Sequence, residues 1–314
     1  MIAPWQITHL DVIVYFFLYV FTLSFIYYII FNKSTQVCKK RAGYRYYTFC
    51  EKEGYRVSGR SGKMEENGDL KTHISVIIPA HNEEKYIKRC MDSIKAADQR
   101  FPGNTEIIVV CNRCTDQTGS IAEQNGARIV LNEDRCIAKV RNAGIAAAKG
   151  KIIVTIDADN RMTKNTLREI YALLKRGKYI GGGAPIRFER YSFPLWCNDI
   201  LCRISFKLTG LYCGIFWAEK KSFDAIGGFA DIKAMEDVAT AKQLKKYGKK
   251  HGKEYTVLRK NHLINSTRKY DDLGDWLYFK LMIKNAGTLI KAAFGDKSGI
   301  DRLLDEMFYD YNDR

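Results

Sequence analysis

The stretch Lys151–Asn160, KIIVTIDADN, decides the fold of this chain. Residues 152–156 are all β-branched and, except for Thr155, apolar, which is typical of a central parallel strand covered on both faces. Asp157 and Asp159 follow where this strand ends. Two carboxylates one residue apart can face one hard cation, and such oxygen ligands select Mg²⁺ or Mn²⁺. The same pair can instead cap a helix predicted over 163–174, so the residues alone leave both interpretations open.

Strand and helix patterns alternate before this stretch. The helix after the first strand is indicated by apolar residues at helical spacing from Ile87 to Ile94. Such alternation predicts an open α/β sheet of mostly parallel strands. Ligands bind such sheets beyond the carboxyl ends of the strands, so the loops 79–84, 111–116 and 157–160 are expected to line one site. The other expected strands are 74–78 (ending at Pro79), 106–110 and 127–131, and the other expected helices are 115–125 and 137–148.

Composition and charge narrow the class of partner. The formal net charge of +16 and the isoelectric point near 9.3 favour a polyanion, which can be nucleic acid, an anionic bilayer or a phosphorylated substrate. The 46% hydrophobic content predicts one principal soluble domain. The nine cysteines are odd in number and scattered, which favours a reducing compartment. Cys111 and Cys114 form a CxxC pair without a second ligand pair, which favours coincidence over a zinc or redox site.

A charge-free run of 20 residues, Val12–Phe31, is long enough to cross a bilayer as a helix. We therefore predict a membrane anchor over 1–32, because a cleaved signal peptide would have basic residues before the run and a shorter apolar core. Basic residues follow the run closely and none precedes it, which predicts a single-pass protein with its C-terminal side in the cytoplasm. Residues 33–72 are polar and rich in charge and glycine, as expected for a basic linker.

Four blocks in fixed order carry a resemblance to a known family: VIIPAHNEE at 76–84, CNRCTDQT at 111–118, AKVRNAGIAAAKGKIIVTIDADN at 138–160 and AIGGFADIKAMEDVATAKQLKKYG at 225–248. Together they resemble the family 2 glycosyltransferases of GT-A fold. The second block departs from that family's pattern, because Cys111 stands where an Asp pair is often found. The resemblance implies a small, non-processive, membrane-anchored member whose GT-A domain, a Rossmann-like sheet flanked by helices, spans 73–314.

The resemblance implies a nucleotide-sugar donor, and the chemistry explains the carboxylates. Negative charge grows on the leaving diphosphate, so a divalent cation, Mg²⁺ or Mn²⁺, is expected to stabilise it. Asp159 is the implied metal ligand, and Asp157 is implied to lie toward the nucleoside. Arg141 adds positive charge in this interpretation, whereas a solvated helix face is the plain alternative. The remaining implied donor-binding residues are Pro79, Ala80, Asn82, Glu84, Asn112 and Asp116.

The acceptor hydroxyl needs a general base, which the family pattern puts in the pair Glu236 and Asp237. Asp237 is the predicted base. The same pair is also expected to begin a helix, where carboxylates favour the N-terminal dipole, and both roles can hold together. With one base and no separate nucleophile, direct displacement with inversion at the sugar C1 is the simpler mechanism.

The C-terminal part carries weaker signals. The Gln-x-x-Arg-Trp motif of processive members does not occur, and residues 266–270 instead resemble a Ser-x-Arg-Arg-aromatic variant, in which Arg268 would clamp the diphosphate. Surface charge is the open alternative for Arg268. Residues 276–290 predict an amphipathic segment that packs on the core or lies on a membrane. Gly181–Gly183 predicts a tight turn.

Three functions remain in competition. The first is sugar transfer from a nucleotide donor to an acceptor at or near the membrane, lipid-linked or not, without nucleic acid as a partner. The second is a nucleotidyltransferase, which would need a glycine-rich, arginine-containing loop where HNEEKY stands at 81–86. The third is a noncatalytic, membrane-tethered binder of polyanions, which leaves the carboxylates unexplained.

Overall fold

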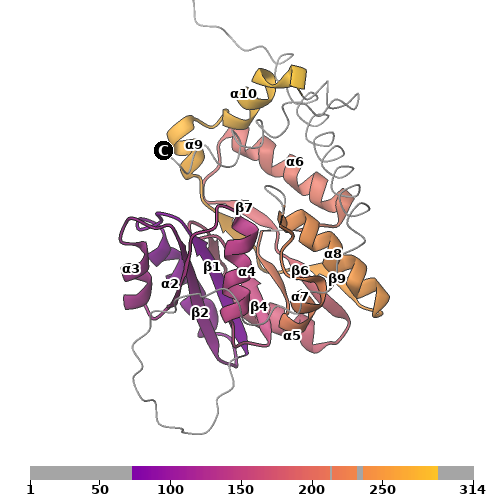
Figure 1. Ribbon diagram of the computed structural model, residues 1–314. Helices are drawn as coiled ribbons and strands as arrows, with labels where there is room; N and C mark the ends of the chain where they lie inside the picture. The colour runs from indigo at the N-terminus through magenta and orange to yellow at the C-terminus, as the bar shows by residue number, and fades with distance from the viewer. Residues whose placement is uncertain (1–72, 213, 232–235, 289–314) are drawn as a thin grey trace, which may run out of the picture. The chain divides into compact units, whose positions relative to one another are not determined.

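The computed structural model of the chain describes residues 73–212, 214–231 and 236–288 (Figure 1). They divide into a larger unit of residues 73–189 and 206–266 and a smaller unit of residues 190–205 and 267–288. The predicted anchor and linker lie outside these described residues. Within the described ranges, no helix combines the length and the apolar character needed to span a bilayer.

A seven-stranded sheet in the order β3-β2-β1-β4-β8-β6-β9 forms the centre of the larger unit. The first four strands of the chain are parallel to one another, while β8 runs antiparallel to both β4 and β6. The predicted α/β fold with a mostly parallel sheet is therefore confirmed. The strands are β1 (Ile74–Ala80), β2 (Thr105–Asn112), β3 (Arg128–Asn132), β4 (Ile152–Thr155), β6 (Tyr179–Gly183), β8 (Phe216–Glu219) and β9 (Glu254–Val257).

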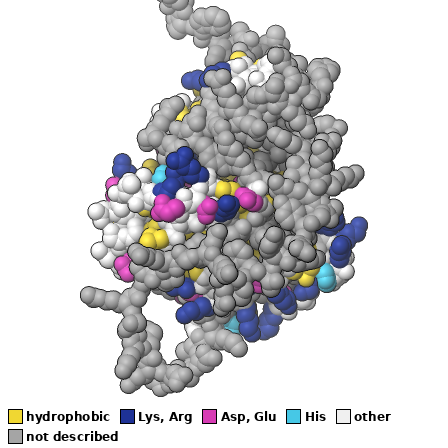
Figure 2. Space-filling view, in the orientation of Figure 1, with side chains coloured by type: hydrophobic (Ala, Val, Ile, Leu, Met, Phe, Trp, Pro, Cys, Tyr) yellow, Lys and Arg dark blue, Asp and Glu magenta, His cyan; other side chains and the backbone are white. Residues whose placement is uncertain are grey.

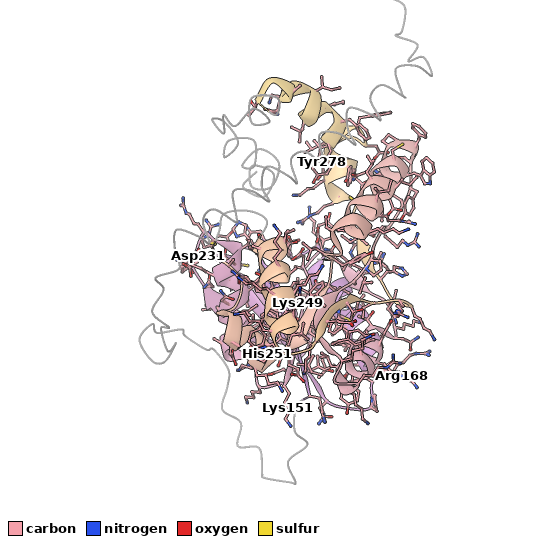
Figure 3. All side chains as sticks on the ribbon, turned by 90° about the vertical axis from the view of Figure 1, so that its right-hand side faces the viewer. Lys151, Arg168, Asp231, Lys249, His251 and Tyr278 are labelled. Carbon is pink, nitrogen blue, oxygen red and sulfur yellow. The ribbon has the colours of Figure 1, made fainter. Side chains whose placement is uncertain are left out.

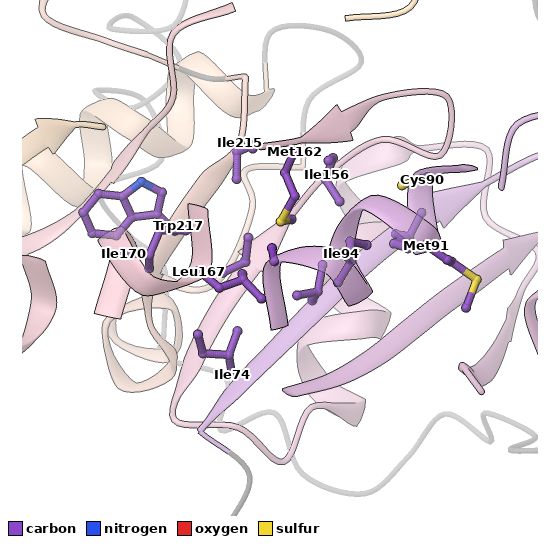
Figure 4. Packing of buried hydrophobic residues seen from close by; sticks show 14 of the residues in the cluster. Ile74, Cys90, Met91, Ile94, Ile156, Met162, Leu167, Ile170, Ile215 and Trp217 are labelled. Atoms are coloured by element: carbon purple, nitrogen blue, oxygen red, sulfur yellow. The ribbon is translucent and has the colours of Figure 1, made fainter. Parts of the chain in front are cut away.

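Helices cover both faces of this sheet because alternate residues of its strands are apolar on each side. Ile74 of β1 belongs to a core cluster that includes Ile94 of α2 and Leu167 of α5 (Figure 4). Ile77, on the opposite face of β1, lies against Gly144 of α4. The helices of this unit are α2 (Ile87–Asp98), α3 (Thr118–Gln124), α4 (Ile137–Ala147), α5 (Thr166–Lys175), α7 (Lys220–Ile226) and α8 (Glu236–Lys250).

A second sheet, in the order β5-β10-β7, follows the acidic pair. It consists of β5 (Arg161–Met162), β10 (Leu263–Asn265) and β7 (Ile186–Phe188). The chain thus enters β5 directly after Asn160, and α5 begins only at Thr166 with Asn165 as its N-cap. The interpretation of Asp157 and Asp159 as a helix cap is therefore wrong. The pair instead occupies the connection between two sheets.

Two local predictions are also corrected. The first strand does not end before Pro79 but continues to Ala80, because its pairing with β2 extends that far. Its pairing with β4 stops at Ile77, so the N atom of Pro79 needs no partner on that side. A proline, which lacks an N–H group, is tolerated where one side needs no partner. The glycines Gly181–Gly183 form part of β6 rather than a turn. A Cβ on any of them would come closer than 3.0 Å to a neighbouring strand or loop, so close backbone approach explains this sequence.

The smaller unit contains the start of α6 (Phe193–Thr209), α9 (Arg268–Leu273) and α10 (Leu277–Lys284). Asn198 of α6 is buried and donates a hydrogen bond of 2.8 Å to the hydroxyl of Tyr270 in α9. The Tyr270 ring also meets that of Tyr278 of α10, labelled in Figure 3, with 5.7 Å between the ring centres. These contacts join the three helices into one compact unit.

Candidate active site

Loops at the carboxyl ends of β1 and β2 lie side by side, because Ala80 pairs with Cys111 in the parallel register. Asn82 and Arg113, in these two loops, are the described non-glycine residues with positive φ, at 53° and 49°. Left-handed backbone at such residues is uncommon and gathers at functional sites. The thiol of Cys114 donates to the Ala80 carbonyl at 3.3 Å and ties the two loops together.

Hydrogen bonds between the two loops hold three of the predicted donor-binding residues, Asn82, Glu84 and Asp116. The Asn82 Oδ1 accepts from the backbone N–H of Thr115 at 2.9 Å. The backbone N–H of Glu84 donates to Asp116 at 3.0 Å, while the Glu84 carboxylate accepts from the N–H of Gln117 at 3.1 Å. Partial burial raises the pKa of Asp116, but hydrogen bonds from Thr118 and Glu84 outweigh it and lower the pKa overall. Asp116 is therefore a fixed carboxylate at neutral pH.

Asn112, at the end of β2, is buried, and its side-chain NH₂ group donates hydrogen bonds to the end of β3 and to the loop that follows it. It donates to the backbone oxygen and side-chain oxygen of Asn132 at 3.1 and 2.9 Å, and to the Asp134 carbonyl at 2.7 Å. The arrangement fixes the orientation of the side-chain amide. The loops after β1, β2 and β3 therefore form one hydrogen-bonded shelf, although a nucleotide-binding role for its residues stays a prediction.

The acidic pair lies on a turn after β4, closed by a hydrogen bond of 3.1 Å from the Asn160 N–H to the Asp157 carbonyl. Asn160 is buried, and its side chain accepts from the N–H of Ser266 at 3.0 Å, which anchors the exit of the turn. The Asp157 side chain is 50% exposed and pairs with Arg141 at 2.9 Å. The turn is thus fixed at its exit while the Asp157 carboxylate still reaches solvent.

Arg141 connects the acidic pair to the predicted base. Its side chain is 12% exposed and forms ion pairs with Asp157 on one side and Glu236 on the other. Its guanidinium also lies 5.3 Å from the centre of the Phe229 ring. Burial lowers the pKa of Arg141, but the carboxylates of Glu236 and Asp157 outweigh it, so the pKa is raised and the cation is permanent. The alternative of a solvated helix face is therefore wrong.

Glu236 and Asp237 begin α8, as predicted. Asp237 is partly buried, and burial raises its pKa to about 7, with the neighbouring charge of Glu236 adding to the shift and Arg141 opposing it. The Glu236 carboxylate is engaged by Arg141, whereas an Asp237 oxygen accepts from the N–H of Val238 at 2.7 Å. A carboxylate with a pKa near neutrality is suited to take up a proton during a reaction.

The donor set fits a cation shared with a substrate. Within the described ranges, no group of three or more His, Cys, Asp or Glu side chains is placed to hold a metal. Mg²⁺ and Mn²⁺ in phosphate-transfer sites are typically held by one or two carboxylates plus the phosphates of the substrate. Asp159, on the turn beside Asp157, provides such a carboxylate, so the residues present fit a metal that binds together with a diphosphate.

Several residues that shape the site were not predicted from the sequence. Asn142, one position after Arg141, accepts from the Phe229 N–H at 2.8 Å and donates to the Phe229 carbonyl at 3.0 Å. This pair holds the chain that follows Gly228 against α4. Asp231, labelled in Figure 3, accepts from the Cys136 thiol at 3.4 Å at the start of α4. The adjacency of Asn142 to Arg141 within an Arg-Asn-x-Gly sequence was the signal available for it.

Two further sequence predictions concern residues other than the carboxylates and Arg141. Cys111 and Cys114 are free thiols joined by a hydrogen bond, which lowers the pKa of Cys114 to about 7. They lie on the predicted donor loops but belong to no zinc ligand set within the described ranges. Arg268 is the first residue of α9 in the smaller unit, so its role as a diphosphate clamp stays a prediction. The last turn of α8 carries Lys249 and Lys250. Figure 2 shows basic side chains at the right-hand and lower edges of the face that it draws.

Comparisons with known proteins agree with this architecture. Residues 75–226 match the family model described as glycosyl transferase family 2. The glycosyltransferase GlyG of Streptococcus pneumoniae is 32% identical over 104 residues, covering 31% of this chain and 34% of that protein. The poly(ribitol-phosphate) beta-N-acetylglucosaminyltransferase TarS of Staphylococcus aureus is 33% identical over 107 residues, covering 32% of this chain and 18% of that protein. These matches span about a third or less of the relatives' lengths.

Solved structures show the same fold. TarS of Staphylococcus aureus in complex with UDP-GlcNAc has a TM-score of 0.50 at 21% identity, covering 62% of this chain and 58% of that one. The mannosyltransferase PcManGT of Pyrobaculum calidifontis, in complex with GDP-Man and Mn²⁺, has a TM-score of 0.51 at 19% identity, covering 73% and 65%. Residues 75–226 therefore match the glycosyl transferase family 2 model, and the solved structures show that the chain has a GT-A-like α/β fold.

Proposed function

We propose that this protein transfers a sugar from a nucleotide-sugar donor to an acceptor hydroxyl, with inversion at the sugar C1. The observation that carries the proposal is the bridge made by Arg141 between Asp157 and Glu236, residues that are far apart in the sequence. The bridge brings the acidic turn after β4 and the start of α8 into one site. A donor side and an acceptor side, each with its own carboxylates, then face a common centre.

In the proposed reaction the acceptor oxygen attacks C1 while its proton passes to the Asp237 carboxylate. The bond between C1 and the diphosphate oxygen breaks, and its electron pair leaves with the diphosphate. Mg²⁺ or Mn²⁺ bound at Asp159 would supply positive charge next to that leaving group. Arg141 keeps Glu236 paired, so the Asp237 side chain, with its pKa near 7, is the better proton acceptor of the two.

The donor shelf supports a nucleotide as the carrier of the sugar. It presents fixed polar side chains and two strained loop residues at the carboxyl edge of a parallel sheet, where open α/β sheets bind nucleotides. We propose that Asn82, Glu84, Asn112 and Asp116 contact the nucleoside or support the loops that do. The two solved structures compared above hold UDP-GlcNAc and GDP-Man, so both uridine and guanosine donors are candidates here.

We further propose that the acceptor lies at a membrane and that the protein is anchored there by Val12–Phe31. The polarity of α6 supports this location. Phe193 and Trp196 are 53% and 52% exposed with their rings stacked at 6.3 Å, whereas Asn198 and Asp199 are buried. A helix that buries polar side chains and exposes aromatic ones is suited to contact with a bilayer interface.

Nucleotide-sugar turnover by the full chain tests the proposal. UDP-, GDP- and dTDP-sugars are incubated with Mg²⁺, Mn²⁺ or a chelator, and the nucleoside diphosphate released is measured. We expect one nucleotide family to be consumed only in the presence of a divalent ion. Consumption of a nucleoside triphosphate and a sugar phosphate with release of pyrophosphate would instead make the protein a nucleotidyltransferase, and binding without turnover would make it a noncatalytic binder.

The membrane part has a separate test based on tryptophan fluorescence. A full-length variant with Trp5→Phe and Trp217→Phe leaves Trp196 and Trp276 as emitters. In vesicles we expect lipids brominated near the headgroup to quench this emission and aqueous iodide to quench it weakly. Strong quenching by iodide with none by the lipids would contradict a bilayer contact at Trp196 and Trp276, even if the chain remains bound to vesicles through its N-terminal segment.

A further inference from the structure

The backbone of the acidic turn is held from helix α2. Arg89 donates from Nη2 to the Asp159 carbonyl at 3.2 Å, and the thiol of Cys90 lies 3.6 Å from the Asp157 carbonyl. Adjacent residues of one helix therefore reach two carbonyls of the turn that carries the predicted metal ligand. Nothing in the reaction as proposed above uses these contacts.

Glu189, the residue after β7, fixes Arg89 in turn. The Nη1 and Nη2 atoms of Arg89 donate to the two Glu189 carboxylate oxygens at 2.9 and 2.6 Å, which is a bidentate pair. Arg161, the first residue of β5, donates to the same carboxylate at 3.3 Å. Glu189 thus reaches both sides of the turn, through Arg89 before Asn160 and through Arg161 after it. The Glu189 side chain is 19% exposed, so water screens these pairs only in part.

We propose that Glu189 and Arg89 are positioning residues of the metal site, which set the location of Asp159 through its backbone. This inference rests on the proposed role of Asp159 as metal ligand. Mg²⁺ and Mn²⁺ sites demand narrow ranges of distance and angle, so a small displacement of the Asp159 carboxylate weakens binding. Changes to residues that orient a metal ligand typically cost ten- to a hundredfold in metal affinity.

The opposite end of the sheet offers a matched control. Arg128 pairs with Glu106 at 3.3 Å and also donates to the Ala147 carbonyl, so it too combines an ion pair with a backbone contact. The side chains of Arg128 and Glu106 are 28% and 18% exposed, close to the 36% and 19% of Arg89 and Glu189. Arg128 begins β3 and Glu106 stands near the start of β2, whereas the acidic turn follows the end of β4. Loss of the Arg128 pair is therefore expected to affect stability without moving Asp159.

The experiment is a Mn²⁺ titration of the full chain in the presence of UDP or GDP, followed by electron paramagnetic resonance of the free ion. We expect Glu189→Gln and Arg89→Gln to raise the Mn²⁺ Kd about tenfold or more, and Arg128→Gln to leave it unchanged. Thermal unfolding of each variant shows that the comparison is made on folded protein. Arg89→Lys keeps the charge without the fork and is expected to resemble Arg89→Gln.

Three results would overturn the inference. A Mn²⁺ Kd within about twofold of the wild-type value in folded Glu189→Gln would show that Asp159 needs no such support. An equal loss in Arg128→Gln would show a general effect of stability. If the wild-type chain binds no Mn²⁺ with either nucleotide, the proposed role of Asp159 fails and the inference fails with it, which is a different outcome from intact wild-type binding with unaffected variants.

Discussion

The pairing of Arg141 and Glu236 beside Asp237 predicts opposite pH shifts when each is removed. Arg141 lowers the pKa of Asp237 and Glu236 raises it, and together with burial they leave it at about 7. A general base acts in its ionised form, so activity should rise with pH through this value. The ionised fraction grows from about one tenth at pH 6 to about nine tenths at pH 8, a gain of about tenfold in kcat/KM.

Loss of the cation in Arg141→Gln should move this ascending limb to higher pH by about 1 unit or more, the usual effect of one nearby opposite charge. At pH 7 the ionised fraction then falls from about one half to about one tenth, which is about a fivefold loss. Glu236→Gln removes a like charge and should move the limb to lower pH. Asp237→Asn should remove the limb together with transfer.

The assay is nucleoside diphosphate release at limiting donor, measured from about pH 5 to about pH 9. Donor binding is followed in parallel at each pH, because Asp157 also contacts Arg141 and its disturbance would change KM. Shifts of the limb in the same direction in Arg141→Gln and Glu236→Gln would contradict these opposite effects on the pKa of Asp237. Persistence of the wild-type limb in Asp237→Asn would show that another group is the base.

Three further predictions concern Gly144, Cys114 and Asp237, which all lie in the larger unit. Gly144→Ala should cost about 1–3 kcal/mol and lower the melting temperature, because its Cβ would strike the Ile77 side chain, while Gly287→Ala, with open space around it, should not. Iodoacetamide should label Cys114 at a rate that rises through about pH 7, and bound donor should slow the labelling; an unchanged rate would place the donor elsewhere. Asp237→Asn should stabilise the protein at pH 8 more than at pH 5. The pKa of Asp237 rises from 3.8 to about 7 on folding, so ionisation of this carboxyl destabilises the folded wild-type protein increasingly as the pH rises from 3.8 to about 7. Equal shifts of the melting temperature at pH 5 and pH 8 would contradict this.

Much of the sheet could be predicted because its strands are apolar and β-branched and lie between helices with clear periodicity. Residues 152–156 illustrate this, since the observed β4 covers Ile152–Thr155. The α8 start at Glu236 was also predicted. The position of Gly181–Gly183 in a strand was not predicted, because a run of glycines predicts a turn by local rules. In the structure these residues are glycines because the neighbouring backbone leaves no room for side chains.

The contacts that assemble the site were beyond the reach of sequence patterns. Arg141 and Glu236 are 95 residues apart, and Arg89 and Glu189 are 100 apart. Such pairs depend on tertiary packing and leave no periodic signal in the sequence. The candidate residues themselves could be found from their place at strand ends. Their partners, and the exclusion of Arg141 from solvent, required the structure.

Donor binding to variants of the two carboxylates tests the central claim most directly. Calorimetric titration of UDP- and GDP-sugars is carried out on wild-type protein, Asp159→Asn and Asp237→Asn, each with Mn²⁺ and with a chelator. We predict that the wild type and Asp237→Asn bind one donor in a Mn²⁺-dependent manner, and that Asp159→Asn does not. Mn²⁺-dependent binding that survives in Asp159→Asn, or is lost in Asp237→Asn, would contradict the division of the site into a donor side and an acceptor side.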